Sequence, residues 1–168
     1  MAWYADLSPC DYLGTAHTSH LKAVGWLAPT QPFTTGPVPP NVFRRLCELT
    51  QDPWAPFASA GCHDCEFCRF TGGGEAQYVG FRVSAKSGGI LFVPGQGFLY
   101  VSPTSITHYI DGHGYRPPDE FAQAVLGCPP MRSVEYLTRV LNNGGRRLRE
   151  AIPNDEPLPS SSRSRNNV

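Results

Sequence analysis

The sequence predicts an α+β domain in which a zinc site joins a short antiparallel β-meander to about four helices. Three observations support this fold class. Between residues 76 and 101, short apolar or alternating stretches are separated by glycine turns, a pattern typical of strands joined as hairpins. Other segments carry apolar residues at helical spacing. Cysteines and histidines gather in two separate segments with the spacing of metal ligands.

Composition limits the classes of protein that the chain can represent. Its 168 residues include 17 Gly and 17 Pro, which predicts a single turn-rich domain over residues 1–150 and a disordered, polar tail over 151–168. The 14 basic and 14 acidic residues cancel, which argues against nucleic acid as a partner. The chain shows no secretory signal and no apolar run of the roughly 18 residues that a membrane span needs. We therefore expect a cytoplasmic protein with no membrane contact.

The first half of the chain is expected to hold two strands and one helix. Residues 21–27 are mostly apolar and predict a short strand. Asn41 is expected to cap a helix over residues 42–49, where apolar positions recur at helical spacing. Residues 54–60 predict a strand that leads into the first cysteine cluster.

The meander is expected over three strands joined by short turns. Residues 76–85 alternate between polar and apolar side chains and predict one half-buried strand. Residues 90–93 and 98–101 predict the other two, each preceded by a turn that contains glycine.

Three further helices are expected after the meander. Ser102 and the proline that follows it predict a helix start, and Gly112 and Gly114 predict its end. The next helix is expected to begin at residues 116–120. Ser133 is expected to cap the last helix, and the Asn-Asn-Gly-Gly stretch at 142–145 is expected to stop it.

The strongest motif is a pair of cysteines and a pair of histidines. Cys65 and Cys68 form a Cys-x-x-Cys turn, and His108 and His113 lie near the end of a predicted helix. These residue types and spacings predict a closed tetrahedral Zn²⁺ site with Cys65, Cys68, His108 and His113 as its ligands. Positions i and i+5 lie about 140° apart on a regular helix, so Gly112 is expected to let the helix tighten or unwind and bring His113 back. Residues 69–107 separate the two pairs, so the motif is not a compact classical zinc finger.

The ligand set has alternatives. Cys62 forms an equally spaced pair with Cys65, and His63 could replace one of the distant histidines. The four residues could also be reduced cysteines and packed histidines without a metal. In a secreted protein, the clustered cysteines could instead pair with Cys10, Cys47 and Cys128, but clustered cysteines in the cytoplasm are more typical of metal sites.

Several motifs resemble a group of small uncharacterised bacterial proteins that have no established activity. The matching features are His-x-Cys-x-x-Cys at 63–68, Phe-Leu-Tyr-Val at 98–101, His-Tyr-Ile-x-x-His-x-Tyr-x-Pro-Pro-x-Glu-Phe at 108–121 and Cys-Pro-Pro-Met at 128–131. The resemblance spans roughly residues 1–149. It implies that His63 belongs to the motif as much as Cys65 and Cys68 do.

These features predict a non-enzymatic, zinc-stabilised domain that acts through protein contacts. The sequence lacks the His-Glu-x-x-His motif of many metalloproteases and the deaminase pattern, and we predict no catalytic residue. One alternative is a zinc hydrolase with an open metal position beside Asp64, Asp111 or Glu120. Another is a nucleic-acid-binding zinc module that uses the arginines at 146, 147 and 149 and the tail.

Overall fold

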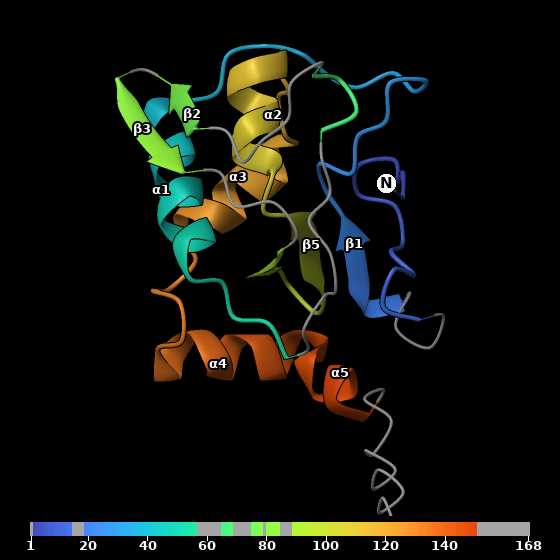
Figure 1. Cartoon of the computed structure of the whole chain (residues 1–168). Coiled ribbons are helices and arrows are strands. Elements are labelled where there is room, and N and C mark those ends of the chain that lie inside the picture. Colours follow the sequence, from blue (N-terminus) through green and yellow to red (C-terminus); the bar gives the residue numbers. More distant parts are fainter. Residues whose placement is uncertain are drawn as a thin grey trace, which may run out of the picture.

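The computed structural model describes residues 2–14, 19–56, 65–68, 75–78, 80–84 and 89–150. The predicted tail at 151–168 lies outside these residues, as do Cys62 and His63. Within them the α+β class is confirmed: a three-stranded mixed sheet and a two-stranded hairpin are combined with helices (Figure 1). None of the described helices has the length and apolarity required to cross a bilayer.

The three-stranded sheet has the order β1-β5-β4. Strand β4 (Ile90–Pro94) runs antiparallel to β5 (Leu99–Pro103), as the sequence predicts. Strand β1 (Leu21–Ala23) pairs parallel with β5 and joins the sheet from far away in the sequence. All five residues of β5 are buried because it is the central strand.

The first strand of the predicted meander does not join this sheet. Residues predicted as one strand over 76–85 form two, β2 (Glu75–Tyr78) and β3 (Phe81–Ser84), which pair with each other as a separate antiparallel hairpin. Gly80 has a φ of 78° in the reversal, a conformation that glycine adopts without strain. Polar and apolar residues alternate on both sides of this turn, so the sequence pattern does not reveal the turn. The hairpin lies beside helix α1 (Pro40–Gln51) and helix α2 (Ile106–His113) (Figure 1).

Two helices pack beside the hairpin, α1 against β3 and α2 against β2. Helix α1 begins one residue before the predicted cap Asn41, because a proline suits the first helical position. Helix α2 begins later than predicted. Ser102, the expected cap, instead belongs to β5, which pairs with β4 as far as Pro103, and the helix starts after Ser105.

Of the remaining helices, α3 (Asp119–Leu126) packs mainly against α1, and α4 (Val134–Val140) packs against β4. Helix α3 begins where predicted, and α4 is capped by Ser133, whose Oγ accepts a bond of 3.1 Å from Tyr136 N. The predicted stop at 142–145 is confirmed. In this turn, η2 (Leu141–Gly145), the backbone leaves helical geometry at Asn143 and at Gly144, whose φ is 107°, and a further helix that the sequence did not predict, α5 (Arg146–Glu150), follows.

Helix α4 packs inward through Tyr136 and Val140, which are buried, whereas Val134 is 82% exposed. The Tyr136 hydroxyl donates to the Phe92 carbonyl at 2.9 Å and so ties α4 to β4. Trp54 packs against the rings of Phe92 and Tyr136, at centroid distances of 5.8 and 6.4 Å, but the described residues 54–56 form no strand. Residues 57–60 of that predicted strand lie outside the described chain.

Candidate metal centre

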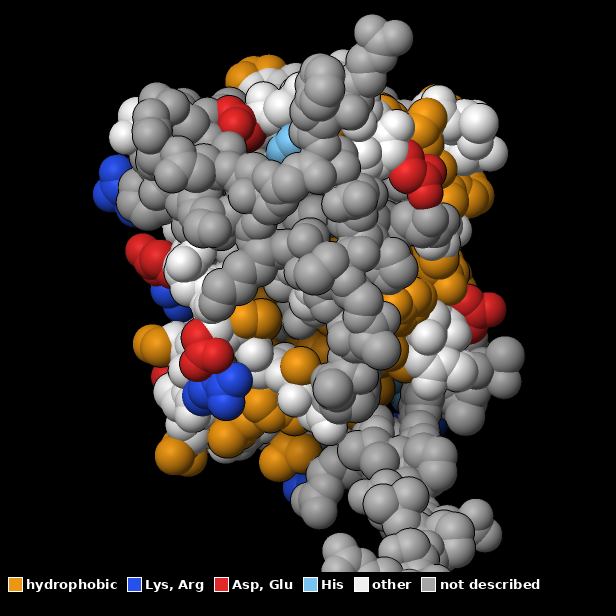
Figure 2. Space-filling model, viewed as in Figure 1, with side chains coloured by type: hydrophobic (Ala, Val, Ile, Leu, Met, Phe, Trp, Pro, Cys, Tyr) orange, Lys and Arg blue, Asp and Glu red, His pale blue; other side chains and the backbone are white. Residues whose placement is uncertain are grey.

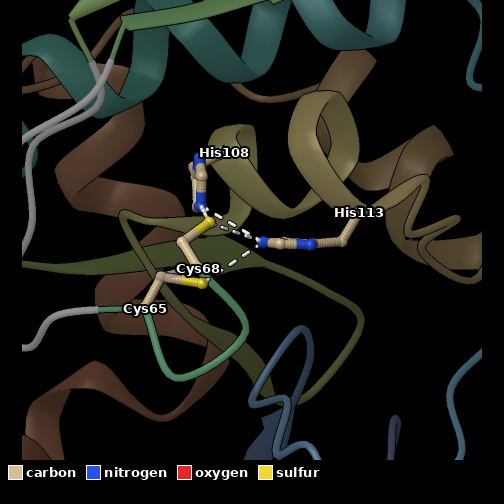
Figure 3. A group of neighbouring side chains, drawn as sticks. All are labelled: Cys65, Cys68, His108 and His113. Atoms are coloured by element: carbon tan, nitrogen blue, oxygen red, sulfur yellow. Dashed lines mark hydrogen bonds between the residues drawn. The ribbon is translucent and has the colours of Figure 1, made fainter. Parts of the chain in front are cut away.

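Four side chains from two distant segments converge at the end of α2 (Figure 3). Cys65 and Cys68 come from a short turn, and His108 and His113 come from α2. One donor atom from each of the four lies within 4.8 Å of the other three. The structure therefore brings together the ligand set that the sequence ranked first, while the alternates Cys62 and His63 remain outside the described residues.

The spacing of these atoms fits one small tetrahedral cation. The His113 Nε2 atom lies 3.3 Å from Cys65 Sγ, from Cys68 Sγ and from His108 Nε2, and Cys68 Sγ lies 3.2 Å from His108 Nε2. Bonds of about 2.3 Å to sulfur and 2.05 Å to nitrogen give tetrahedral edges of about 3.3 Å between nitrogens and about 3.6 Å between sulfur and nitrogen. The donor set therefore matches a zinc-like shell with only a small expansion.

Hydrogen bonding alone accounts poorly for the same arrangement. A single imidazole nitrogen carries either one hydrogen or one lone pair, so it completes at most one ordinary hydrogen bond. His113 Nε2 nevertheless faces three donor or acceptor atoms at one distance. A cation at the common centre needs only one lone pair from each of the four atoms, and this satisfies the geometry without conflict.

An aromatic cluster holds the cysteine turn against α2. The turn is closed by a bond of 3.4 Å from Cys68 N to Cys65 O. Phe67, between the two cysteines, packs on the His113 ring at 5.0 Å and on Phe33 at 5.6 Å. The sequence analysis missed this role of Phe67. An aromatic residue inside a Cys-x-x-Cys turn is the signal that could have indicated it.

The two histidines converge without any unwinding of the helix. The expected distortion at Gly112 is absent, because α2 stays helical as far as His113 and ends at Gly114, whose φ is 64°. Gly112 serves a different purpose: a Cβ atom there would lie 3.1 Å from Cε1 of His108. The glycine therefore leaves room for the His108 ring, which lies 5.0 Å from the His113 ring at 88°.

A half-buried carboxylate, that of Asp6, fixes the chain just after the site. The Tyr115 hydroxyl lies 2.9 Å from both oxygens of Asp6, and Asp6 Oδ1 accepts a further bond of 2.9 Å from Gly25 N. Burial raises the pKa of Asp6, and these two bonds oppose that shift. The clamp joins the end of α2 to the N-terminal segment. Nothing in the local sequence of Asp6 or Tyr115 predicted this pairing.

Burial sets the protonation of the donor groups. It lowers the pKa of His108, and it lowers the pKa of His113 together with the nearby His108. Both imidazoles are therefore held in the neutral form that binds metals. Burial, and then the neighbouring Cys65, raise the pKa of the Cys68 thiol. A cation must therefore displace a proton from this thiol, and protons compete with it for the site.

The three acidic residues considered for a catalytic role do not lie together at the metal cluster. Asp111 acts on His108 electrostatically and raises its pKa against the effect of burial. Glu120 instead accepts a bond of 3.0 Å from the Tyr100 hydroxyl, on the sheet. Asp64 lies outside the described residues.

The fold and the site together define an α+β protein with a Cys2His2 cluster that could hold a metal ion. The chain belongs to the family "Domain of unknown function (DUF7919)", whose model matches residues 2–126. The match includes all four cluster residues and ends at the last residue of α3. No curated protein and no solved structure matched the chain.

Proposed function

We propose that the protein is a zinc-binding domain in which the ion has a structural role and the domain acts through contacts with other proteins. The observation that carries the proposal is the convergence of Cys65, Cys68, His108 and His113 on one point. Two sulfurs and two imidazoles favour Zn²⁺ over Mg²⁺ or Ca²⁺, which prefer oxygen ligands.

The number of donors supports a structural ion over a catalytic one. Catalytic zinc usually has three protein ligands and keeps one position for water, whereas structural zinc has four. Four donors are available here, and they would complete the tetrahedron. The aromatic packing of Phe67 on His113 also supports a site built to hold two segments together.

Surface features support a protein partner rather than a nucleic acid. Basic and acidic side chains are interspersed among the described residues on the face shown in Figure 2, and the whole chain has no net charge. Trp3 and Val134 are large apolar side chains with exposed fractions of 42% and 82%. Such side chains suit contacts with another protein more than contacts with phosphates.

Elemental analysis of protein purified without chelator tests the zinc proposal. One zinc per chain is expected, and a Co²⁺-substituted sample should show the visible spectrum of tetrahedral thiolate coordination. A chain that is purified without metal and gains no stability when Zn²⁺ is added would overturn the proposal. Zinc-dependent hydrolysis of ester or phosphoester substrates, lost in Cys68→Ser, would instead support an enzyme.

A further inference from the structure

A recess beside the sheet is lined by residues other than the four of the metal cluster. It has a volume of about 670 Å³ and is formed by β1, β5, the turn between β4 and β5, α3 with the loop that follows it, and α4. This volume lies in the range of about 300–1,000 Å³ that is typical of small-molecule sites. Its main lining side chains are Lys22, Phe98, Tyr100, Glu120, Ala124 and Arg139.

One wall of the recess is aromatic. The rings of Phe98 and Tyr100 meet edge to face at 4.9 Å. A Cβ atom at Gly95 would lie 2.6 Å from the Phe98 ring, so the glycine allows this ring to lie over the turn. These two rings make this wall of the recess apolar.

An incomplete ion pair stands beside this wall. Register pairs Lys22 with Tyr100, so both side chains point to one face of the sheet. Lys22 Nζ lies 4.1 Å from the Phe98 ring centroid and 3.8 Å from Glu120 Oε1. The second distance is too long for a direct hydrogen bond, for which about 2.7–2.9 Å is usual between charged groups.

Both members of this pair have unused bonding capacity. Glu120 Oε1 accepts from Tyr100, while no described residue donates to Oε2 within hydrogen-bond distance. The Lys22 ammonium has three hydrogens and, among the described residues, makes no hydrogen bond to Glu120 at 3.8 Å. Arg139 is already committed, since it donates to the Gly127 carbonyl at 2.9 Å and to Glu135 at 2.8 Å.

We infer that this recess binds a small zwitterion with an apolar side chain, namely an apolar L-amino acid. Its carboxylate would accept from Lys22 and its ammonium would donate to Glu120. Its side chain would lie against Ala124 and the edge of the Phe98 ring, because Lys22 Nζ already lies over the face of that ring. A ligand with a single charge would pair with either Lys22 or Glu120. The other residue would then face a neutral part of the ligand or a charge of its own sign. A zwitterion satisfies both, so it fits the recess better than a simple acid or amine does.

Binding is tested with the zinc-loaded full chain by isothermal titration calorimetry and by ¹H–¹⁵N NMR. The probes are L-phenylalanine, 3-phenylpropanoate, which lacks the ammonium, and phenethylamine, which lacks the carboxylate. We expect saturable binding of L-phenylalanine with shifts at the amides of Lys22, Phe98 and Glu120. Each analogue should bind at least about tenfold more weakly, because each loses one charged hydrogen bond.

Two variants of neighbouring acidic residues sharpen the test. Glu120→Gln should weaken L-phenylalanine binding about tenfold. Asp119→Asn removes the same charge from the adjacent residue, which pairs with Arg116 outside the recess, and should leave binding unchanged. The inference is overturned if L-phenylalanine shows no saturable binding, if the three probes bind equally, or if both variants lose affinity equally. The comparison of probes needs only the unmodified chain, so it decides the matter even if a variant fails to fold.

Discussion

Removing one thiolate ligand should show how much the metal contributes to stability. Cys68→Ser keeps the size of the side chain but replaces sulfur with a hydroxyl, which is a poor zinc ligand. Cys68 and His108 are 40 positions apart. Joining chain segments across a loop of that length restricts the unfolded chain by about 4 kcal/mol in the chain-entropy treatment of cross-links. For a domain of this size, a loss of that amount lowers the melting temperature by roughly 10 °C.

Urea unfolding with and without EDTA is the assay, with zinc content measured on the same samples. EDTA should reduce the free energy of unfolding of the wild type by about 4 kcal/mol and should have no effect on Cys68→Ser. Cys128→Ser is the matched control, because Cys128 is buried and lies outside the cluster. It should retain one zinc per chain and the full response to EDTA, although it is less stable. An equal response to EDTA in all three proteins would refute a structural role for these ligands.

Three further predictions concern the surroundings of the cluster. Gly112→Ala should weaken zinc binding about tenfold in a competition with a chelator, because the added Cβ would lie 3.1 Å from the His108 ring. Gly127→Ala is the control and should not weaken zinc binding, because the nearest contact of its Cβ would be at 3.5 Å. Unchanged zinc affinity in Gly112→Ala would disprove that this glycine leaves room for the His108 ring. The metal-free chain should lose stability as the pH falls from about 7 to 5. The pKa values of His108 and His113 are lowered in the folded chain, so the unfolded chain binds more protons in this pH range. Urea unfolding measures this, and a free energy of unfolding that does not change with pH would contradict the prediction. Tyr115→Phe should lower the free energy of unfolding by about 1–3 kcal/mol, because it removes the buried hydroxyl that contacts Asp6. The variant should still bind one zinc per chain. Loss of the zinc would show that the metal site depends on the contact between Tyr115 and Asp6.

Local chemistry explains which parts of the fold could be predicted from the sequence. The Cys-x-x-Cys turn, the pair β4–β5 and the cap at Ser133 each depend on residues that are close together in the chain, and the structure contains them all. The four cluster residues were selected because only a few residue types bind zinc, so distance along the chain did not hide them.

Features that depend on distant partners could not be predicted in this way. Strand β1 pairs with β5 in a parallel register that neither segment encodes alone. The reversal at Gly80 was hidden because the same alternation continues on both sides of the turn. Asp6 and Tyr115 are 109 positions apart, and no local pattern distinguishes them from exposed residues.

The end of α2 is where these long-range connections meet. The cluster ties it to Cys65 and Cys68, and two residues after His113 the Tyr115 hydroxyl ties it to the N-terminal segment. By contrast, the β4–β5 pair is held by its own ladder and by the bond from Tyr136 to Phe92, neither of which involves a cluster residue. Metal loss should therefore loosen the cysteine turn and the end of α2 first and leave this part of the sheet paired. The chain is rich in glycine and proline, and little regular secondary structure holds the cysteine turn in place. A bound metal ion would fix this turn to the end of α2 with only four side chains.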